Sequence, residues 1–258
     1  LNDFPAIPKD DIRFRLTLPS SIIGTWVSTA RSFHSNDALF PALQGFCMTF
    51  DGNDIMFAAT DRFKLFADTY TNDSSIGIDE KVSIVVHNKV FNPLLSLLSL
   101  DEKVDITIGT TCVTFAVGDA KLNCRLIEGA YPNVKSIIPQ TSVVDVEVPK
   151  SDLFDSVKRT LIVANGSSRQ LVFNVSNDTM HISAVDMEMG REGKEECPCN
   201  VVKGDEIIEF SLKGDNLVSC LGAIDSSDVV FHLISKERAI LMSDKERPSK
   251  IILTMPMV

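Results

Sequence analysis

The sequence lacks any long run of apolar residues. The longest apolar stretch, residues 90–100, is interrupted by one proline and three polar residues, whereas a membrane-spanning helix needs about 20 consecutive, mostly apolar residues. A composition of 44% hydrophobic and 23% charged residues excludes a disordered chain, and 258 residues suit about two domains. We therefore expect a soluble, globular protein.

Positive charge is also scarce. The chain has 25 Lys and Arg residues against 35 Asp and Glu residues, which gives a formal charge of −10. The field of such a molecule repels phosphate, so binding through a basic tail is excluded. Any nucleic acid must be met by a locally basic face.

Motifs for nucleotide or metal binding are missing. Neither G-x-x-x-x-G-K-[ST] nor G-x-G-x-x-G occurs, and the 13 glycines are dispersed singly. The four histidines show no H-x-x-H or H-E-x-x-H spacing. We therefore expect no nucleotide hydrolysis, no metal site and no cofactor.

The six cysteines form no C-x-x-C pair and have no repeated spacing. Such a scattered set is typical of a reducing compartment, which predicts a cytoplasmic protein. The one close pair, Cys197 and Cys199, has no histidine nearby to complete a zinc site, so a structural role is expected.

Closely spaced carboxylates occur at Asp186 and Glu188 and at Glu195 and Glu196. Pairs of this kind serve general acid–base catalysis when their surroundings shift the pKa values apart. Charges at this spacing are more often found on a solvated loop, and we expect that environment for them. The sequence therefore predicts no catalytic site.

A repeated pattern runs through the chain, and its four copies begin near residues 12, 82, 143 and 207. Each copy has a strand of alternating polarity, a capping segment, a helix with apolar periodicity and then a strand meander. The predicted first strands are residues 12–18, 82–86, 144–148 and 207–212, and the predicted helices are residues 22–33, 90–100, 152–164 and 216–224.

One helix and a small sheet cannot bury both of their apolar faces alone, so the copies should pair. We therefore predict an α+β protein of two tandem domains, at residues 9–140 and 141–258. Residues 129–139 and residues 1–8 both contain an aromatic residue followed by Pro and then a second Pro. We expect residues 1–8 to be the tail of a missing preceding domain.

Three motifs lie in register with this repeat: TDRFKL at residues 60–65, EGAYP at 128–132 followed by IIP at 137–139, and MPM at 255–257. Together they resemble the bacterial DNA polymerase III beta subunit family, the sliding clamps, over the entire chain. The family shows an A-T-D-G-H-R-L-like run, an F-P-D-Y-x-x-V-I-P-like exit and a terminal M-P-M. The resemblance covers its middle and C-terminal domains and not its first.

The resemblance implies the DNA clamp fold, with helices lining the interior of a ring closed by two three-domain subunits. It implies a non-catalytic processivity factor that encircles double-stranded DNA without sequence preference. The implied partners are the replicative polymerase alpha subunit, the clamp loader and repair polymerases, all bound through linear motifs, together with a second copy when the first domain is present.

By the same resemblance, linear peptides bind an apolar groove between the two domains. Carried over by position, its residues are Leu43, Thr60, Arg62, Phe63, Lys64, Leu65, Pro132, Ile137, Met255, Pro256 and Met257. Flexible methionines suit a groove that accepts several peptides.

Four groove positions depart from the family pattern. Arg62 and Phe63 replace Gly and His, Lys64 replaces Arg, and Ser136 stands where a basic residue is common. Arg62 either narrows the groove or binds a peptide acid, and we expect peptide preference to differ.

Basic residues at predicted helices are candidates for the DNA-facing surface. They are Arg31, Lys89, Lys150, Lys158, Arg159 and Lys213. Several lie at a helix start, where the positive end of the helix dipole adds to their charge.

Three alternatives are open. The first is a two-domain clamp homologue that binds linear peptides without encircling DNA. The second is a two-domain subunit that closes as a trimer, although the TDRFKL and MPM motifs belong to the bacterial type. The third, a hydrolase using Asp186 and Glu188, is the least expected.

Overall fold

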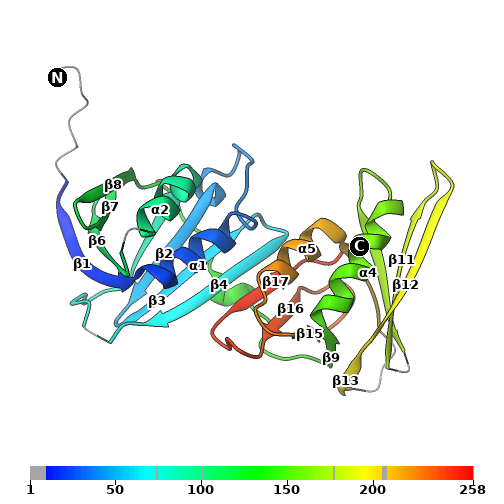
Figure 1. The fold of residues 1–258 in the computed structure, drawn as a ribbon. Helices are drawn as coiled ribbons and strands as arrows, with labels where there is room; N and C mark the ends of the chain where they lie inside the picture. The colour runs from blue at the N-terminus through cyan, green and yellow to red at the C-terminus, as the bar shows by residue number, and fades with distance from the viewer. Residues whose placement is uncertain (1–9, 74, 100, 177, 205–207, 258) are drawn as a thin grey trace. The chain divides into compact units, whose positions relative to one another are not determined.

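The computed structural model describes residues 10–73, 75–99, 101–176, 178–204 and 208–257. They form two compact units. The first contains the described residues up to Asp61 together with Asp68–Pro132, and the second contains Arg62–Ala67 and the described residues from Asn133 onward (Figure 1). Residues 133–140, predicted in the first domain, thus pack with the second unit. The predicted tail at residues 1–8 lies outside the described residues.

Two four-stranded arrangements and two helices build the first unit. Its elements are β1 (Ile12–Pro19), α1 (Ser20–Ala30), η1 (Pro41–Leu43), β2 (Gly45–Asp51), β3 (Asp54–Thr60), the later part of β4 (Lys64–Thr71), β5 (Val82–His87), η2 (Asn88–Val90), α2 (Phe91–Leu98), β6 (Lys103–Gly109), β7 (Cys112–Val117) and β8 (Ala120–Arg125). One sheet has the order β1-β6-β7-β8, and the other has β5-β2-β3 followed by β4.

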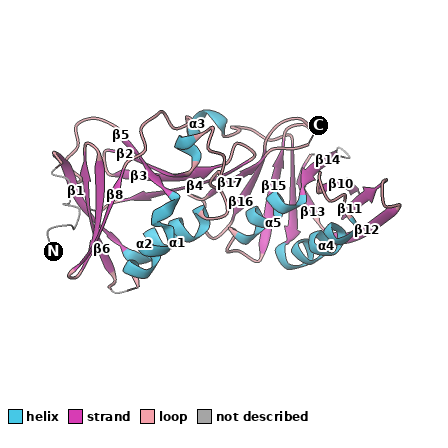
Figure 2. Ribbon diagram, turned by 90° about the horizontal axis from the view of Figure 1, so that it is seen from above, coloured by secondary structure: helices cyan, strands magenta, loops and turns pink. Residues whose placement is uncertain are grey.

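The core of the first unit lies between these sheets and the helices. Helix α1 buries Ile23, Trp26, Val27 and Ala30, the spacing of one helix face, and α2 lies beside it (Figure 2). The Trp26 ring stacks on Phe57 at 5.2 Å, and its Nε1 donates a 2.8 Å hydrogen bond to the buried Asp68 carboxylate. The indole is thus both packed and satisfied.

The second unit repeats the plan. Its elements are the start of β4, α3 (Val134–Ile137), β9 (Val144–Pro149), α4 (Lys150–Val163), β10 (Gln170–Ser176), β11 (Thr179–Asp186), β12 (Arg191–Pro198), β13 (Asn200–Lys203), β14 (Ile208–Lys213), α5 (Gly214–Gly222), β15 (Asp228–Leu233), β16 (Ile240–Asp244) and β17 (Ile251–Thr254). One sheet has the order β12-β11-β10-β14, and the other has β13-β9-β15-β16-β17 followed by the start of β4.

Helices α4 and α5 pack against each other and against these sheets (Figure 1). Gly214 permits the close approach, since a Cβ at this position would lie 2.4 Å from Leu161 Cδ2. Phe173 and Phe210 stack at 5.1 Å beneath them. The second unit therefore has its own apolar core.

The predicted α+β architecture, with two strand–helix–meander copies in each half, is confirmed. The predicted helix bounds were displaced. Helices α1 and α4 start directly after Pro19 and Pro149, at residues predicted as caps, because no turn separates strand from helix. Phe33, predicted as helical, follows the end of α1 and is fully buried in the next turn.

The longest helix among the described residues, α4, has 14 residues, and none of the described helices is long and apolar enough to cross a membrane.

Candidate functional site

Seven of the predicted groove residues meet in the second unit, and we call them the tail cluster: Arg62, Phe63, Lys64, Leu65, Met255, Pro256 and Met257. Strand β17 pairs antiparallel with the start of β4, so that Leu253 lies opposite Leu65 and Thr254 opposite Lys64. The pairing continues past β17, because the Met255 N–H donates a 2.8 Å hydrogen bond to the Phe63 carbonyl. Two segments that lie almost 200 residues apart in sequence thus form one surface.

The other side of the tail is fixed to β14. The Met257 N–H donates a 2.8 Å hydrogen bond to the Ser211 carbonyl, and Pro256 forms a bridge with Leu212. Pro256 lies between these two donors and has no N–H of its own to donate. The tail is therefore held on one side by Met255, at the start of β4, and on the other by Met257, at β14. Met255, Pro256 and Met257 are held half-buried, with part of each side chain open to a ligand.

Arg62 and Phe63 form the most exposed part of the tail cluster. Phe63 is 54% exposed, although large aromatic side chains are usually buried. Arg62 has a φ of +82°, a left-handed conformation that favours glycine. Its guanidinium lies 5.7 Å from the centre of the Phe63 ring, within the range of a cation–π contact.

The remaining groove residues lie elsewhere. Ile137 belongs to the second unit, where it ends α3 and is 40% exposed. Leu43, Thr60 and Pro132 belong to the first unit. Leu43 and Thr60 are buried at 5% and 6% exposure, whereas Pro132 is exposed.

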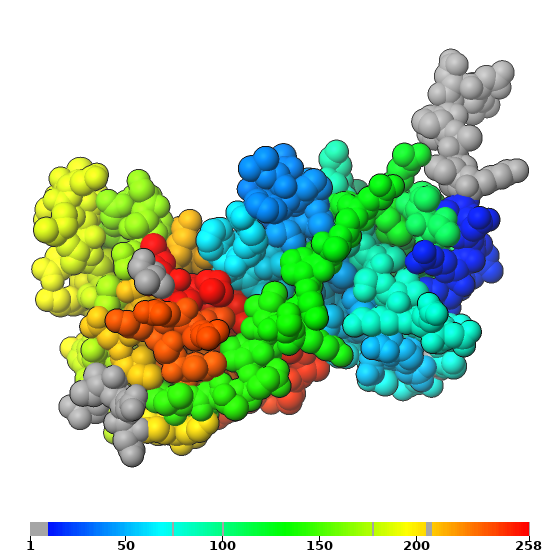
Figure 3. Space-filling model, turned by 180° about the vertical axis from the view of Figure 1, so that it is seen from behind, coloured from blue at the N-terminus to red at the C-terminus, as the bar shows by residue number. Residues whose placement is uncertain are grey.

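The aromatic residue of the EGAYP motif anchors the segment that leaves the first unit. The Tyr131 hydroxyl donates a 3.4 Å hydrogen bond to the Ala58 carbonyl on β3. Burial strongly raises the pKa of Tyr131, so the phenol stays protonated and keeps donating. Glu128, Gly129 and Ala130 before it are exposed, and this part of the chain runs over the surface in Figure 3.

Four of the six predicted DNA-facing residues are exposed, and no ion pair with a residue that the structure describes fixes them. Arg31 caps the end of α1, and Lys89 lies in η2, both in the first unit. Lys213 precedes α5, and Lys158 on α4 holds its ammonium 4.1 Å from the centre of the Phe154 ring. These side chains can present positive charge to a phosphate backbone.

Lys150 is held inside the second unit. Its ammonium donates a 2.7 Å hydrogen bond to the Ile224 carbonyl just beyond α5. Lys250 acts beside it: its side chain is 1% exposed and donates to the Ala223 carbonyl and to the Asp225 carboxylate, at 2.9 and 2.5 Å. Both cations satisfy carbonyls at the negative end of the α5 dipole.

Arg159 is bound to a neighbouring strand. Its Nε and Nη2 donate to the two carboxylate oxygens of Glu195 at 3.0 and 2.8 Å, and Nη2 also contacts Ser156. The hydrogen bond from Arg159 lowers the pKa of Glu195. Much of the positive charge of Arg159 is therefore neutralised within the chain.

The solvated environment predicted for the carboxylates was wrong for Asp186. Asp186 is 2% exposed, and its carboxylate accepts hydrogen bonds from the N–H groups of Glu188 and Met189, both at 3.1 Å. Burial alone would raise its pKa, but these donors and Arg191 outweigh it and lower the pKa. Asp186 closes the β11–β12 turn as an ionised acceptor.

Burial disfavours the thiolate form of the closely spaced pair Cys197 and Cys199. All six are free thiols, and burial raises the pKa of Cys197 to about 12 and also raises that of Cys199. Among the described residues, no group of three or more His, Cys, Asp or Glu side chains is placed to hold a metal ion.

Several residues of these surfaces had no signal in the sequence. Ser211 and Leu212 hold the tail through main-chain atoms, which any residue supplies. Glu195 was noted only as one of two adjacent acids. Lys250 has the charge of an exposed residue, and only the fold shows that it is buried.

Comparisons with known proteins agree with this architecture. The family described as "DNA polymerase III beta subunit, central domain" matches residues 18–133, and its C-terminal domain matches residues 135–258. The beta sliding clamp of Staphylococcus epidermidis is 21% identical over 257 residues, which cover 99% of this chain and 67% of that protein.

Solved structures give the same fold. The DNA polymerase III subunit beta of Pseudomonas aeruginosa superposes with a TM-score of 0.93 at 20% identity, covering all of this chain and 70% of that one. A sliding clamp from the same organism bound to griselimycin gives a TM-score of 0.92 at 21% identity, covering 69% of its chain. The chain thus belongs to the DNA polymerase III beta subunit family, of which it carries the central and C-terminal domains.

Proposed function

We propose that this chain forms two domains of a DNA sliding clamp. As part of a ring it encircles double-stranded DNA and tethers the replicative polymerase alpha subunit, the clamp loader and repair polymerases. It acts as a cytoplasmic processivity factor, with no catalytic site and no cofactor of its own.

The observation that carries the proposal is the match of both units, over almost the whole chain, to two consecutive domains of one family. The repeated strand–helix plan supports it, because each unit has one pair of adjacent helices, α1 with α2 and α4 with α5. In the proposed ring these pairs line the hole.

Contact with DNA needs only weak, sequence-blind attraction. A ring that encloses DNA cannot dissociate without opening, whereas tight phosphate binding would impede sliding. The exposed Arg31, Lys89, Lys158 and Lys213 supply this attraction, and the charge of −10 keeps DNA from other faces. Lys150 and Arg159, held by Ile224 and Glu195, contribute less.

Partner recognition is assigned to the tail cluster with Ile137, Leu43, Thr60 and Pro132. Half-buried methionines beside the exposed Phe63 ring offer an adaptable apolar surface for linear peptides. The griselimycin-bound clamp from Pseudomonas aeruginosa supports a ligand-binding role for relatives of this fold.

Ring closure requires a further interface, and one exposed apolar group suits it. Ile162 on α4 is 74% exposed, and Met187 and Met189 in the β11–β12 turn are 88% and 67% exposed. Exposed apolar residues on adjacent elements are typical of association surfaces. A second copy of the full-length protein is the proposed partner on this face.

A loading experiment tests the proposal. The full-length protein is incubated with nicked circular DNA, a clamp loader and ATP, and DNA-bound protein is separated by gel filtration. We expect co-elution with the circle and release when a restriction enzyme linearises it. Equal retention on circular and linear DNA, or no loading, would contradict enclosure.

The second candidate is a two-domain clamp homologue that binds linear peptides without encircling DNA. It is favoured by the tail cluster, because seven groove residues lie in one unit of this chain. A fluorescence titration with a clamp-binding peptide that starts with Gln and ends in Leu-Phe separates the two. Peptide binding by the full-length protein without ring assembly or loading would support this candidate.

A further inference from the structure

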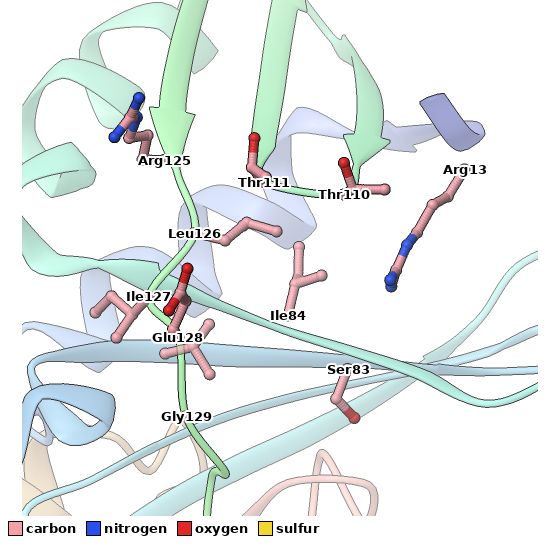
Figure 4. Close-up of a pocket in the computed structure, with 11 residues that line it drawn as sticks. Arg13, Ser83, Ile84, Thr110, Thr111, Arg125, Leu126, Ile127, Glu128 and Gly129 are labelled. Carbon is pink, nitrogen blue, oxygen red and sulfur yellow. The ribbon is translucent and has the colours of Figure 1, made fainter. Parts of the chain in front are cut away.

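A pocket of about 620 Å³ lies in the first unit, and none of the residues that line it belongs to the tail cluster. It is formed by β1, by β5, by the β6–β7 turn and by the segment that follows β8 (Figure 4). Its lining includes Arg13, Ser83, Ile84, Arg125, Leu126 and Glu128.

One wall of the pocket is the edge of a sheet. Strand β5 pairs with β2 along one side, with Ser83 opposite Thr49 and Val85 opposite Cys47. On its other side the Val85 carbonyl accepts a 2.8 Å hydrogen bond from the Ile127 N–H. Main-chain groups of residues two apart point to the same side of a strand, so Ser83 directs its N–H and C=O outward beyond this contact.

Nothing in the described part of the chain pairs with that outer edge at Ser83, where the pocket opens. An unpaired strand edge is a template for an added strand. The open part of this edge is short, because the bridge between Val86 and Leu126 occupies the edge further along β5. An added segment can therefore pair only near Ser83, which fixes its register.

The pocket carries an available positive charge. Arg13 and Arg125 are both exposed, and neither makes an ion pair with any residue that the structure describes. Figure 4 shows the Arg13 guanidinium extending into the pocket, whereas that of Arg125 points away from it. The Glu128 carboxylate lies on the far side, beyond Leu126 and Ile84.

The neighbouring acid is already satisfied. Asp10 accepts hydrogen bonds from the Thr110 hydroxyl and from the N–H groups of Thr111 and Cys112. These bonds, led by that from Thr110, lower the pKa of Asp10 to about 2. Arg13 is therefore the group in this pocket that is left to bind an anion.

The second unit shows the same local arrangement, which marks it as a built feature of the fold. There Met257 donates to Ser211 and Pro256 bridges Leu212, as Ile127 donates to Val85 and Leu126 bridges Val86 in the first unit. Each unit thus fixes two apolar residues to the strand that opens its second half.

We propose that this pocket binds an extended peptide segment as an added strand on β5. An acidic side chain of the segment pairs with Arg13, and an apolar side chain two residues away, on the same face of the added strand, lies against Leu126 and Ile84. Main-chain hydrogen bonds at Ser83 supply register and the side-chain pockets supply selectivity. This site goes beyond the proposed function and does not depend on it.

The test uses the ¹⁵N-labelled chain and the acetylated, amidated peptide TVDTLV, whose Asp and Leu lie on one face of a strand, in an NMR titration. We expect the Ser83 and Val85 amide resonances to shift on binding. The matched peptide TVNTLV, which lacks the carboxylate, should bind about five-fold more weakly, the effect of one exposed ion pair worth about 1 kcal/mol.

Arg13→Glu and Arg15→Glu form a matched pair, because they change the net charge equally on the same strand while Arg15 lies outside the pocket. Arg13→Glu should weaken binding of TVDTLV at least about five-fold, and Arg15→Glu should leave it unchanged. Equal losses in both variants, or no shift at Ser83 and Val85 with millimolar peptide, would overturn the proposal. Loading onto circular DNA by the full-length protein is expected in either case, so the two proposals fail separately.

Discussion

The two units start their first long helix in the same way and differ in one side chain. In the first unit Pro19 is followed by Ser20, and in the second Pro149 is followed by Lys150. Lys150 reaches the end of α5 and donates to the Ile224 carbonyl, whereas the Ser20 hydroxyl is buried and has no hydrogen-bond partner among the described residues. A depression of about 930 Å³ beside Ser20 is lined by Leu95, Leu98 and Ser99 of the region that ends α2.

The difference shows that one backbone plan admits two ways of ending its second helix. The second unit uses the half-buried Lys150 and the buried Lys250 to satisfy carbonyls beyond α5, and burial of Lys250 takes its charge out of water. In the first unit, helix α1 is held by the packing of Trp26 on Phe57 and by the hydrogen bond from Trp26 to the buried Asp68.

Lys250→Met should have the largest effect. It removes the cation that contacts Asp225 and Asp244, whose side chains are 52% and 0% exposed, and leaves a buried carboxylate uncompensated. Loss of one partner of a buried pair costs about 3–5 kcal/mol of unfolding free energy. Urea unfolding followed by circular dichroism measures it, with Lys245→Met, whose side chain is 55% exposed, as the control. Equal effects of the two variants would contradict burial of Lys250.

Asp68→Ala should destabilise the first unit by about 1–3 kcal/mol, because the Trp26 N–H loses its acceptor while still buried. Trp26 is the single tryptophan, so its fluorescence reports the first unit alone. We expect the urea midpoint by fluorescence to fall. A midpoint that stays at the wild-type value would show that the free energy gained from this hydrogen bond only offsets the cost of desolvating Asp68 and the Trp26 N–H.

Reciprocal exchange at the helix starts tests the contrast itself. Lys150→Ser should destabilise the second unit by about 1–2 kcal/mol, since the Ile224 carbonyl loses a charged donor. Ser20→Lys should stabilise the first unit by less than about 1 kcal/mol if the longer side chain reaches the end of α2. Thermal unfolding of both variants measures the changes. Destabilisation by Ser20→Lys would contradict the equivalence of the two positions.

Asp10→Asn should give the smallest effect, a loss of stability that is present near neutral pH and vanishes in acid. The folded pKa of Asp10, about 2, lies below the ordinary value of 3.8. A depressed pKa adds stability that is fully present above pH 4 and is lost as pH falls toward 2. Asp10→Asn should therefore flatten the pH dependence of first-unit stability between pH 4 and 2, measured by Trp26 fluorescence. Asp11→Asn serves as the control, and an unchanged slope would contradict the assignment.

Local patterns were enough to predict the repeat and most of its elements. The four first strands and the four helices have a 2-residue or 3.6-residue period that survives without knowledge of their partners. The individual strands of the meanders were harder to predict: β8 and β13, for example, are short and half-exposed, and their apolar residues make no distinct pattern. They form because β7 and β9 offer an edge to pair with.

Of the candidate site, the sequence predicted only the residues that belong to recognisable motifs. The resemblance named Arg62, Phe63 and the terminal Met255 and Met257, but not the hydrogen bonds that hold the tail between β4 and β14. Those bonds use main-chain atoms of Phe63 and Ser211, and no side-chain pattern encodes them. Lys150 has the charge and position of a DNA-facing residue, and only the distance to Ile224 shows its other role.

The proposed retention of DNA by enclosure, and not by contact energy, can be tested with salt. Full-length protein loaded onto a closed circle is followed by single-molecule fluorescence while NaCl is raised to 1 M, where surface charges are screened within about 3 Å. We expect the residence time on closed circles to change little with salt and to collapse when the DNA is cut. A residence time that falls steeply with salt on closed and cut DNA alike would contradict it.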